Sequence, residues 1–431
     1  MLRRLDASGA LAESRGAAAE PDAAVRDAVR RIIAAVRADG DDALRRYTER
    51  FDGCRVDALL VPPDAAKAAL DAIDPELRAA LELAAGRIRT YHEAQAAVPE
   101  PGGIDADGVR VTETIRPVDR AGIYVPGGRA AYPSTVLMTA IPAAVAGVTE
   151  IALCVPPGAD GRVPGVTLAA AAIAGVDELY RVGGAQAIAA LAYGTESIRP
   201  VDVIVGPGNA YVSEAKREVA GAGIVGIESP AGPSELIVVA DTTAPASFVA
   251  ADLVAQAEHG PGGAVILVTD DPLVADAVDA EVARALAELP PDRRSEAEST
   301  LQTGGRAVIV RDLDEALAVV NAFAPEHLEL MTADPEALLP LVRNAGAVFM
   351  GPYAPTAYGD YSSGANHVLP TSGAARFSSA LRVDDFRKHV HVVRADAGAA
   401  AGCVAHAGRI IAEAEGLDAH AHSFRVRSEE P

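Results

Sequence analysis

Apolar residues in the first part of the chain recur at the three- and four-residue spacing of an amphipathic helix. The clearest stripe lies in residues 25–36, and Gly40 follows it as a predicted stop. A second short helix is predicted over residues 44–51 and a third over residues 75–95. Residues 1–24 are rich in alanine and weakly patterned, so we expect an extension that packs elsewhere.

From Gly122 onward, short apolar runs rich in β-branched residues alternate with alanine-rich stretches of helical length. Such an order of strand, helix and strand is typical of parallel sheets covered by helices. The strands are predicted at residues 123–125, 151–155, 179–182, 201–205, 236–240, 264–268, 307–310 and 347–350. The intervening helices are predicted at residues 134–148, 166–175, 185–193 and 210–220. The predicted fold class is therefore α/β: two Rossmann-like domains with parallel sheets covered by helices, plus helical N- and C-terminal extensions.

A chain of 431 residues is too long for one ordinary core, so two major domains are expected. The predicted division begins with an N-terminal extension over residues 1–24. The first α/β domain is discontinuous and takes residues 25–121 and 236–379, and the second takes residues 122–235. Residues 380–431 form a helical tail that holds His389, His391, His406, His420 and His422.

The net charge is −22, from 38 basic and 60 acidic side chains, and no basic tract occurs. This balance argues against nucleic acid or an anionic membrane as a partner. No apolar run is long enough to cross a membrane, and the charged N-terminus lacks the apolar stretch of a signal peptide. We therefore expect a cytoplasmic protein. The three cysteines form no CxxC pair, which indicates neither a disulfide framework nor a thiolate zinc site.

Glycine-rich turns lie where parallel strands are expected to end, at residues 126–128, 183–184, 206–209 and 231–234. Ligands gather at the carboxyl ends of such strands, and each turn would let the backbone approach a phosphate or ribose. Each is equally well explained as a structural turn. The GxGxxG pattern formed by Gly221, Gly223 and Gly226 lacks the strand before it and the helix after it, so we do not interpret it as a dinucleotide site.

Four short segments carry candidate chemistry. Gln256 and His259 share a face at the predicted end of a helix, where they either ligate an ion such as zinc or are simply solvated. Glu326 and His327 place an acid beside an imidazole: the histidine can take and return a proton and the carboxylate can activate water, or the pair merely starts a helix. Both side chains reach one site only from a turn or a helix start.

The third segment is the polar, glycine-punctuated stretch 358–370, which is typical of a binding loop or of a surface loop. In it Asp360 offers an oxygen ligand and His367 a substrate contact. The fourth segment holds Glu415 and His420 in the tail, where they are either solvated or reach a site by fold-back or in a partner subunit. Gln256, His259, Asp360 and His420 together would make a mixed nitrogen and oxygen set with positions open for substrate.

Seven blocks of the chain resemble the histidinol dehydrogenase family, in the family's order, between about residue 25 and residue 427. They are GIYVPGG at 122–128, VGGAQA at 182–187, GPGN at 206–209, AGPSE at 231–235, QAEHG at 256–260, PEH at 325–327 and SGANHVLP at 363–370. The resemblance implies a zinc-dependent, NAD-linked enzyme of histidine biosynthesis that oxidises L-histidinol to L-histidine through histidinal.

The resemblance also implies roles for individual residues. One zinc ion per subunit would be held by Gln256, His259, Asp360 and His420. NAD would contact Tyr124, Gln186 and Asn209. The substrate would be held by the zinc ligands together with Ser234, Glu326, His327, His367 and Glu415, with Glu326 and His327 as the catalytic pair. A homodimer is implied, in which the C-terminal tail completes the neighbour's site.

Three other functions remain open at this point. One is a dehydrogenase on the same scaffold that oxidises another small alcohol, such as a sulfonated diol. Another is a zinc hydrolase with Glu326 as base, although the chain has no HExxH helix. The third is a metal-binding scaffold without catalysis.

Overall fold

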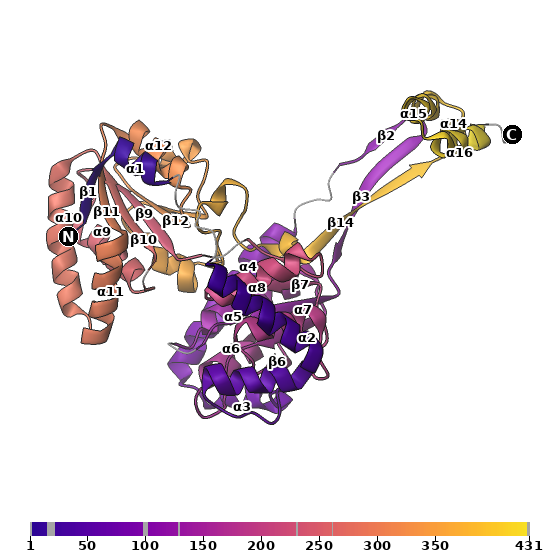
Figure 1. Cartoon of the computed structure of the whole chain (residues 1–431). Helices are drawn as coiled ribbons and strands as arrows, with labels where there is room; N and C mark the ends of the chain where they lie inside the picture. Colours follow the sequence, from indigo (N-terminus) through magenta and orange to yellow (C-terminus); the bar gives the residue numbers. More distant parts are fainter. Residues whose placement is uncertain are drawn as a thin grey trace.

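The computed structural model describes residues 2–14, 22–97, 102–127, 130–229, 232–260 and 262–428. Two parallel sheets, each covered by helices on both faces, make up the body, and a three-stranded antiparallel arm projects from it (Figure 1). The α/β class and the helical terminal regions agree with the sequence prediction. Gly128 and Ala231, which belong to two of the predicted turns, lie outside the described residues, and so does Pro261, which follows the QAEHG block.

The larger sheet has six parallel strands in the order β1-β11-β10-β9-β12-β13. They are β1 (Arg3–Asp6), β9 (Glu235–Ala240), β10 (Ala264–Thr269), β11 (Gly305–Ile309), β12 (His327–Met331) and β13 (Ala347–Met350). The surrounding helices are α1 (Ala7–Ser14), α9 (Ala246–Ala257), α10 (Pro272–Glu288), α11 (Pro291–Gly304), α12 (Leu313–Phe323) and α13 (Pro335–Leu338), with a 3-10 turn η1 (Leu339–Leu341).

Successive residues of β9 enter two different cores, which explains its uninterrupted apolar sequence. Leu236 and Val238 pack in the core beneath α9, α10 and α11. Ile237 and Val239 point the other way, into the core beneath α1 and α12. A strand buried on both faces loses the alternation of polar and apolar residues. β1 extends this sheet, so the N-terminal extension packs as an edge strand and a short helix.

The smaller sheet has five parallel strands in the order β6-β5-β4-β7-β8. They are β4 (Arg120–Tyr124), β5 (Glu150–Cys154), β6 (Glu178–Tyr180), β7 (Val203–Val205) and β8 (Gly226–Ile227). The connecting helices are α5 (Pro133–Ala146), α6 (Gly165–Ala174), α7 (Gly184–Tyr193) and α8 (Ala210–Gly221). The chain reverses its direction of winding between β4 and β7, which is the point where open parallel sheets bind ligands.

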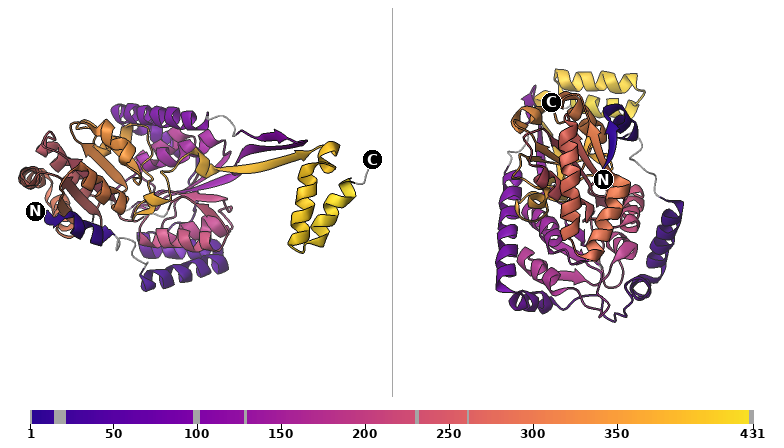
Figure 2. Two further views of the ribbon diagram at one scale, coloured as in Figure 1. Left: turned by 90° about the horizontal axis from the view of Figure 1, so that it is seen from above. Right: turned by 90° about the vertical axis from the view of Figure 1, so that its left-hand side faces the viewer.

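Three N-terminal helices form an outer layer on the smaller sheet: α2 (Ala23–Asp52), α3 (Pro63–Ala72) and α4 (Pro75–Ala96). α2 contacts α7 and α8, α3 contacts α6, and α4 contacts α5 (Figure 2). These contacts differ from the predicted grouping of residues 25–121 with 236–379, although the domain boundaries themselves stay a prediction. The predicted stop at Gly40 is a break inside α2, where φ is 51° and ψ is −130°.

The arm consists of β2 (Ile104–Ala106), β3 (Val109–Pro117) and β14 (Arg387–Ala395), followed by α14 (Ala397–Ala400), α15 (Cys403–Ala414) and α16 (Asp418–Ser428). β14 pairs antiparallel with β3 from Arg387 opposite Pro117 to Ala395 opposite Val109. The prediction of helix from about residue 379 is therefore wrong for this stretch. Its β-branched residues Val390, Val392 and Val393 pair with a strand about 280 positions earlier, and only α14 to α16 are helical.

Short turns of helix lie between β13 and the arm. They are the π-helical turn η2 (Tyr358–Ser362) and the 3-10 turns η3 (Ala374–Arg376) and η4 (Val383–Phe386). Within the described ranges, no helix has both the length and the apolar character needed to cross a membrane.

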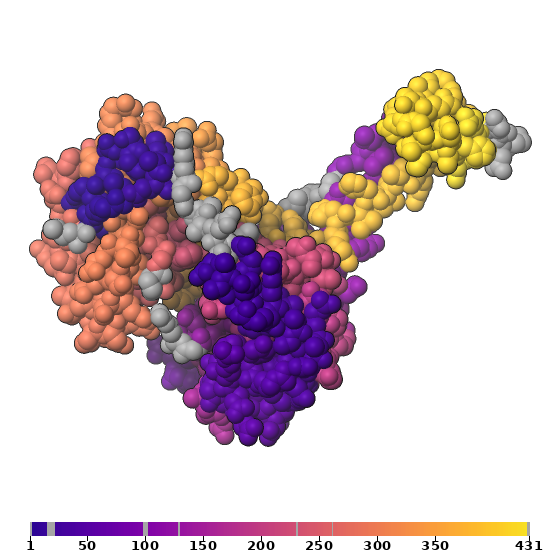
Figure 3. All heavy atoms as spheres, viewed as in Figure 1, coloured from indigo at the N-terminus to yellow at the C-terminus, as the bar shows by residue number. Residues whose placement is uncertain are grey.

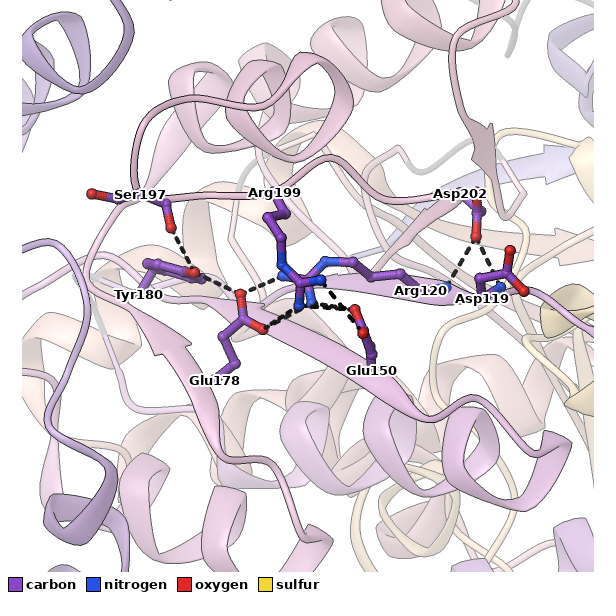
Figure 4. Close-up of polar contacts among 8 residues, drawn as sticks. All are labelled: Asp119, Arg120, Glu150, Glu178, Tyr180, Ser197, Arg199 and Asp202. Carbon is purple, nitrogen blue, oxygen red and sulfur yellow. Dashed lines mark hydrogen bonds and ion pairs between the residues drawn. The ribbon is translucent and has the colours of Figure 1, made fainter.

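A buried arginine fastens the amino edge of the smaller sheet (Figure 4). Arg120 begins β4, and its Nη1 lies 2.8 Å from Oε2 of Glu178 and 3.1 Å from Oε2 of Glu150. These acids begin β6 and β5. Tyr180 donates from its hydroxyl to Glu178 at 2.6 Å. One guanidinium thus connects three neighbouring strands at their first residues.

Candidate active site

The predicted acid and base lie at the amino ends of two adjacent strands in the larger sheet. Glu326 directly precedes β12, His327 is its first residue, and Ser234 directly precedes β9. Strand pairing sets His327 opposite Leu236. Because Glu326 stands in the bend before the strand, it escapes the alternation that would send neighbouring side chains to opposite faces. From the sequence, ligands were expected at the carboxyl ends of parallel strands, whereas Glu326 and His327 lie at the amino ends of the strands of the larger sheet.

The Glu326 carboxylate is held by two donors. Its Oε2 accepts from Oγ of Ser234 at 2.5 Å and from the backbone N–H of Glu235 at 2.9 Å. The residue is buried, so these contacts fix the direction of the carboxylate within the site.

His327 is buried, and its contacts identify its basic nitrogen. Nδ1 lies 3.0 Å from the carbonyl oxygen of Glu235. A carbonyl only accepts, so Nδ1 carries the hydrogen and Nε2 of the neutral ring keeps its lone pair. That Nε2 faces Asp360, whose Oδ1 is 4.0 Å away. The arrangement leaves a proton acceptor directed into the site.

His367 connects the loop of residues 358–370 to α5, a helix of the smaller sheet. Its Nδ1 donates to the carbonyl oxygen of Asp360 at 3.1 Å, and its Nε2 accepts from Oγ1 of Thr135 at 3.1 Å. Burial lowers the pKa of His367, while the nearby Asp360 carboxylate opposes that effect. Thr135 belongs to α5, so the loop meets the helices of the smaller sheet here.

Gln256 and His259 lie at the end of α9, as predicted. The Gln256 side chain is 3% exposed, and its Nε2 has no hydrogen-bond partner among the described residues. His259 is exposed, two positions beyond the last residue of the helix. Its charge is one of those that lower the pKa of His367, which places it in the same electrostatic environment as Asp360 and His327.

Two predicted residues are not brought to this site by the single chain. Glu415 caps the end of α15, and His420 lies in α16. Both helices stand at the far end of the arm, away from the larger sheet (Figure 3). Over the described ranges, no three His, Cys, Asp or Glu side chains are placed to hold a metal ion. The predicted ligands of a single chain's site are Gln256, His259 and Asp360, of which only two are of these residue types. The fourth predicted ligand, His420, lies in the arm.

Two further acids near the site were not singled out from the sequence. Burial and the neighbouring Glu326 raise the pKa of Glu235 to about 7, and its Oε1 accepts from the backbone of Ser372 at 3.1 Å. Burial and the neighbouring Asp252 raise the pKa of Glu329, inside β12, to about 9. The sequence did offer a signal for both acids, because Glu235 begins an apolar strand and Glu329 lies within one.

A separate cavity of about 680 Å³ opens at the carboxyl edge of the smaller sheet. Its lining includes Tyr124, Gln186 and Asn209, the three residues predicted to contact a dinucleotide. The Tyr124 hydroxyl accepts from the backbone N–H of Gly184 at 3.2 Å, and burial raises the pKa of Tyr124 to about 12. Asn209 caps α8 by accepting from the backbone N–H groups of the second and third residues after it, at 3.0 and 3.1 Å.

The side-chain amide of Gln186 in this cavity is buried without hydrogen-bond partners among the described residues. It is 1% exposed, and neither amide atom has a hydrogen-bond partner in the part of the chain that the structure describes. A buried amide without partners costs about 1–3 kcal/mol, which a bound polar group would recover. The N-termini of α7 and α8 also border the cavity and favour negative charge.

Comparison with known proteins gives a consistent result. The sequence model of the histidinol dehydrogenase family matches residues 16–428. The histidinol dehydrogenase of Parasynechococcus marenigrum is 49% identical over 402 residues, covering 92% of this chain and 89% of that protein. The one from Geobacillus kaustophilus is 50% identical over 406 residues, covering 94% of each. The crystal structure of histidinol dehydrogenase from Elizabethkingia anophelis has a TM-score of 0.92 at 36% identity and covers 99% of this chain and 98% of that one.

Proposed function

The chain belongs to the histidinol dehydrogenase family, a family of oxidoreductases in histidine biosynthesis, and we propose that it oxidises L-histidinol to L-histidine through histidinal. We propose NAD as the acceptor and one zinc ion per subunit as the metal. Membership of this family excludes the zinc hydrolase and the non-catalytic scaffold. The observation that carries the proposal is the position of the His327 imidazole beside the fixed carboxylate of Glu326, with Nδ1 held by the carbonyl oxygen of Glu235 and Nε2 directed into the site.

In this mechanism His327 Nε2 accepts the proton of the substrate hydroxyl in each oxidation. Glu326 takes a proton from the water that adds to the aldehyde, giving the hydrate that is oxidised next. Ser234 keeps the Glu326 carboxylate in place, and the backbone of Glu235 keeps the imidazole in the required tautomer. His367, held by Thr135, lies beside Asp360 where substrate would be positioned.

The cavity at the smaller sheet fits a dinucleotide. Tyr124, Gln186 and Asn209 would hold it, since the unmet amide of Gln186 and the two helix N-termini supply donors for ribose and phosphate oxygens. Gly206 has a φ of 117°, and a Cβ there would collide with the backbone oxygen of Tyr124, so the chain is packed closely at the switch point. NAD, when bound, accepts one hydride in each oxidation.

The donors near His327 fit zinc in type. Gln256 brings an unmet amide, His259 an imidazole and Asp360 a carboxylate, which suit a borderline ion. Zinc, when bound, would orient a substrate that itself offers nitrogen ligands. His420 completes this set only if the tail of a second subunit reaches the site, and Glu415 would arrive with it. We therefore propose a homodimer whose tails are exchanged.

The first experiment measures NADH formed per L-histidinol consumed, before and after chelation and after zinc is added back. Two NADH per histidinol, lost with the chelator and restored by zinc, are expected. A folded, zinc-loaded sample that binds NADH but forms none from histidinol would overturn the substrate assignment and favour another alcohol, such as a sulfonated diol.

Exchange of the tails is tested by mixing two variants, His259→Ala and His420→Ala, each of which is expected to be inactive. If the tail acts on the neighbour's site, subunit exchange creates one intact site per mixed dimer and restores activity. No recovery, in samples shown to exchange subunits, would contradict the role of His420 in the partner's site.

A further inference from the structure

A buried ion pair lies behind the switch point of the smaller sheet. Lys216 belongs to α8, and Glu228 directly follows β8. Nζ of Lys216 contacts Oε1 of Glu228, and the two side chains are 5% and 3% exposed. Two charges lose their hydration on burial, so such a pair adds little stability compared with apolar side chains of the same volume. Its contacts with the backbone indicate what it does instead.

Both members of the pair hold Gly206, the residue directly after β7. The ammonium of Lys216 donates to the carbonyl oxygen of Gly206 at 3.0 Å. The backbone N–H of Gly206 donates to Oε1 of Glu228 at 2.8 Å. Hydrogen bonds to charged groups are stronger than those between neutral groups. The pair therefore fixes the peptide units on both sides of Gly206, each with a charge-assisted hydrogen bond.

Gly206 needs such support, because its conformation is not fixed by a side chain. Its φ of 117° lies in the region that favours glycine, and glycine has the greatest backbone freedom. The residue packs against the backbone oxygen of Tyr124 at the end of β4. Three positions after it, Asn209 caps α8. Tyr124 and Asn209 both line the cavity proposed for NAD, whereas Gly206 and the ion pair lie outside its lining.

Resting on the proposed use of NAD at this cavity, we propose that Lys216 and Glu228 are positioning residues for the cofactor. They act through Gly206: by holding its two peptide groups they fix Asn209 and the N-terminus of α8 relative to Tyr124. Loss of the pair frees the backbone at Gly206, so the donors of this turn no longer face the dinucleotide in one arrangement. The proposed acid–base pair stands on the larger sheet, so the effect is confined to the cofactor.

The same sheet offers a matched control at its opposite edge. Arg120 is also buried, with a side chain 6% exposed, and its ion pairs with Glu150 and Glu178 join strands at their amino ends (Figure 4). None of these three residues lines the cavity. Arg120→Met should therefore destabilise the sheet without changing cofactor binding, which separates positioning from folding stability.

The test measures the Kd of NADH, by nucleotide fluorescence and calorimetry, and the KM of NAD and of L-histidinol in the full-length, zinc-loaded protein. Lys216→Met should raise the Kd of NADH and the KM of NAD about tenfold, which is the weight of one charge-assisted hydrogen bond. The KM of L-histidinol should stay at the wild-type value. Arg120→Met should lower the melting temperature and leave the Kd of NADH unchanged.

The double variant Lys216→Met/Glu228→Leu avoids the cost of a lone buried carboxylate, since apolar residues of similar volume often replace a buried ion pair without loss of stability. Both peptide groups of Gly206 lose their partners in it, so NADH should again bind about tenfold more weakly. Wild-type affinity for NADH in this folded variant would overturn the positioning role, and so would an equal loss of affinity in Arg120→Met. Failure of the proposed function looks different: wild type would then bind no NADH, or Gln186→Ala would bind it undiminished.

Discussion

Thr135 and His367 connect the layers of the two parallel sheets, with Oγ1 of Thr135 3.1 Å from Nε2 of His367 across 232 positions of sequence. The same imidazole donates from Nδ1 to the backbone of Asp360, so its ring is fixed from both sides. The proposed substrate site consequently lies at the contact between the layers, and its geometry depends on how they pack.

Thr135→Val should weaken the binding of L-histidinol. The substitution keeps the shape of the side chain but removes the hydroxyl that donates to His367. A neutral hydrogen bond is worth about 1 kcal/mol, so KM for histidinol should rise about fivefold with a smaller change in kcat. Thr303→Val, on the exposed face of α11, is the control for threonine replacement. Equal kinetics in Thr135→Val and wild type would contradict a positioning role.

Glu326→Gln should chiefly impair the second oxidation. The amide keeps an oxygen for Ser234 and the backbone of Glu235 but cannot take a proton from water. Oxidation of added histidinal should fall about 10²- to 10⁴-fold, the usual effect of removing a general base. Ser234→Ala is the companion variant, because it keeps the Glu326 carboxylate but removes the hydroxyl that donates a hydrogen bond to it. Unchanged histidinal oxidation in Glu326→Gln would refute water activation by this residue.

The acid pair Asp252 and Glu329 should make folding stability fall as pH rises. Burial raises the pKa of Asp252 from 3.8 to about 6 and, with Asp252 alongside, that of Glu329 from 4.5 to about 9. The folded state therefore binds more protons than the unfolded state between these values. The stabilising contribution is full below about pH 4 and is lost progressively up to about pH 9.

Glu329→Gln removes this titration while keeping an oxygen for the backbone N–H of Thr356, which donates to Oε1 of Glu329 at 2.9 Å. The variant should gain at least about 1 kcal/mol relative to wild type between pH 5 and pH 8. Urea unfolding at the two pH values measures this difference. A constant difference between variant and wild type across the range would show that Glu329 titrates normally.

Arg120→Met should destabilise the smaller sheet much more than Arg199→Met, although both arginines contact Glu150. The Arg120 side chain is 6% exposed and that of Arg199 64%. Removing the buried cation leaves Glu178 without its main partner, which should cost about 2–4 kcal/mol. The exposed pair should contribute about 0–1 kcal/mol. Denaturant unfolding of both variants tests the contrast, and equal losses would refute it.

The sequence predicted those strands whose two faces are both buried. β9 and β10 read as continuous apolar runs because each side chain enters a core. β12 was not predicted, since His327 and Glu329 interrupt its apolar sequence even though both are buried. β3 and β14 were not predicted because they pair with each other from far apart in the chain, and because β14 is largely exposed and β3 mostly half-buried. Pairing between strands so distant in sequence cannot be predicted from the pattern of residues within either strand.

The residues of the candidate site were likewise predicted only in part from the sequence. Glu326 and His327 were found because an acid beside a histidine suggests proton transfer wherever it occurs. Glu235 was passed over, because its raised pKa comes from burial and from Glu326, 91 positions away. The position of the pair at the amino ends of the strands was also beyond prediction, since it depends on how the two sheets face each other.

The break at Gly40 divides α2 into two rigid rods that meet at a fixed angle. The second rod begins at Asp41, whose backbone N–H donates to Oε2 of Glu196 at 2.8 Å and whose Oδ1 accepts from the backbone of Ser197 at 3.2 Å. Its far end carries Phe51 and Asp52, both in the lining of the cavity. The loop that contains Glu196 and Ser197 thus sets the tilt of this rod from its opposite end. Substitutions at Glu196 or Ser197, which do not line the cavity of the smaller sheet, would therefore alter its width without changing any residue of its lining.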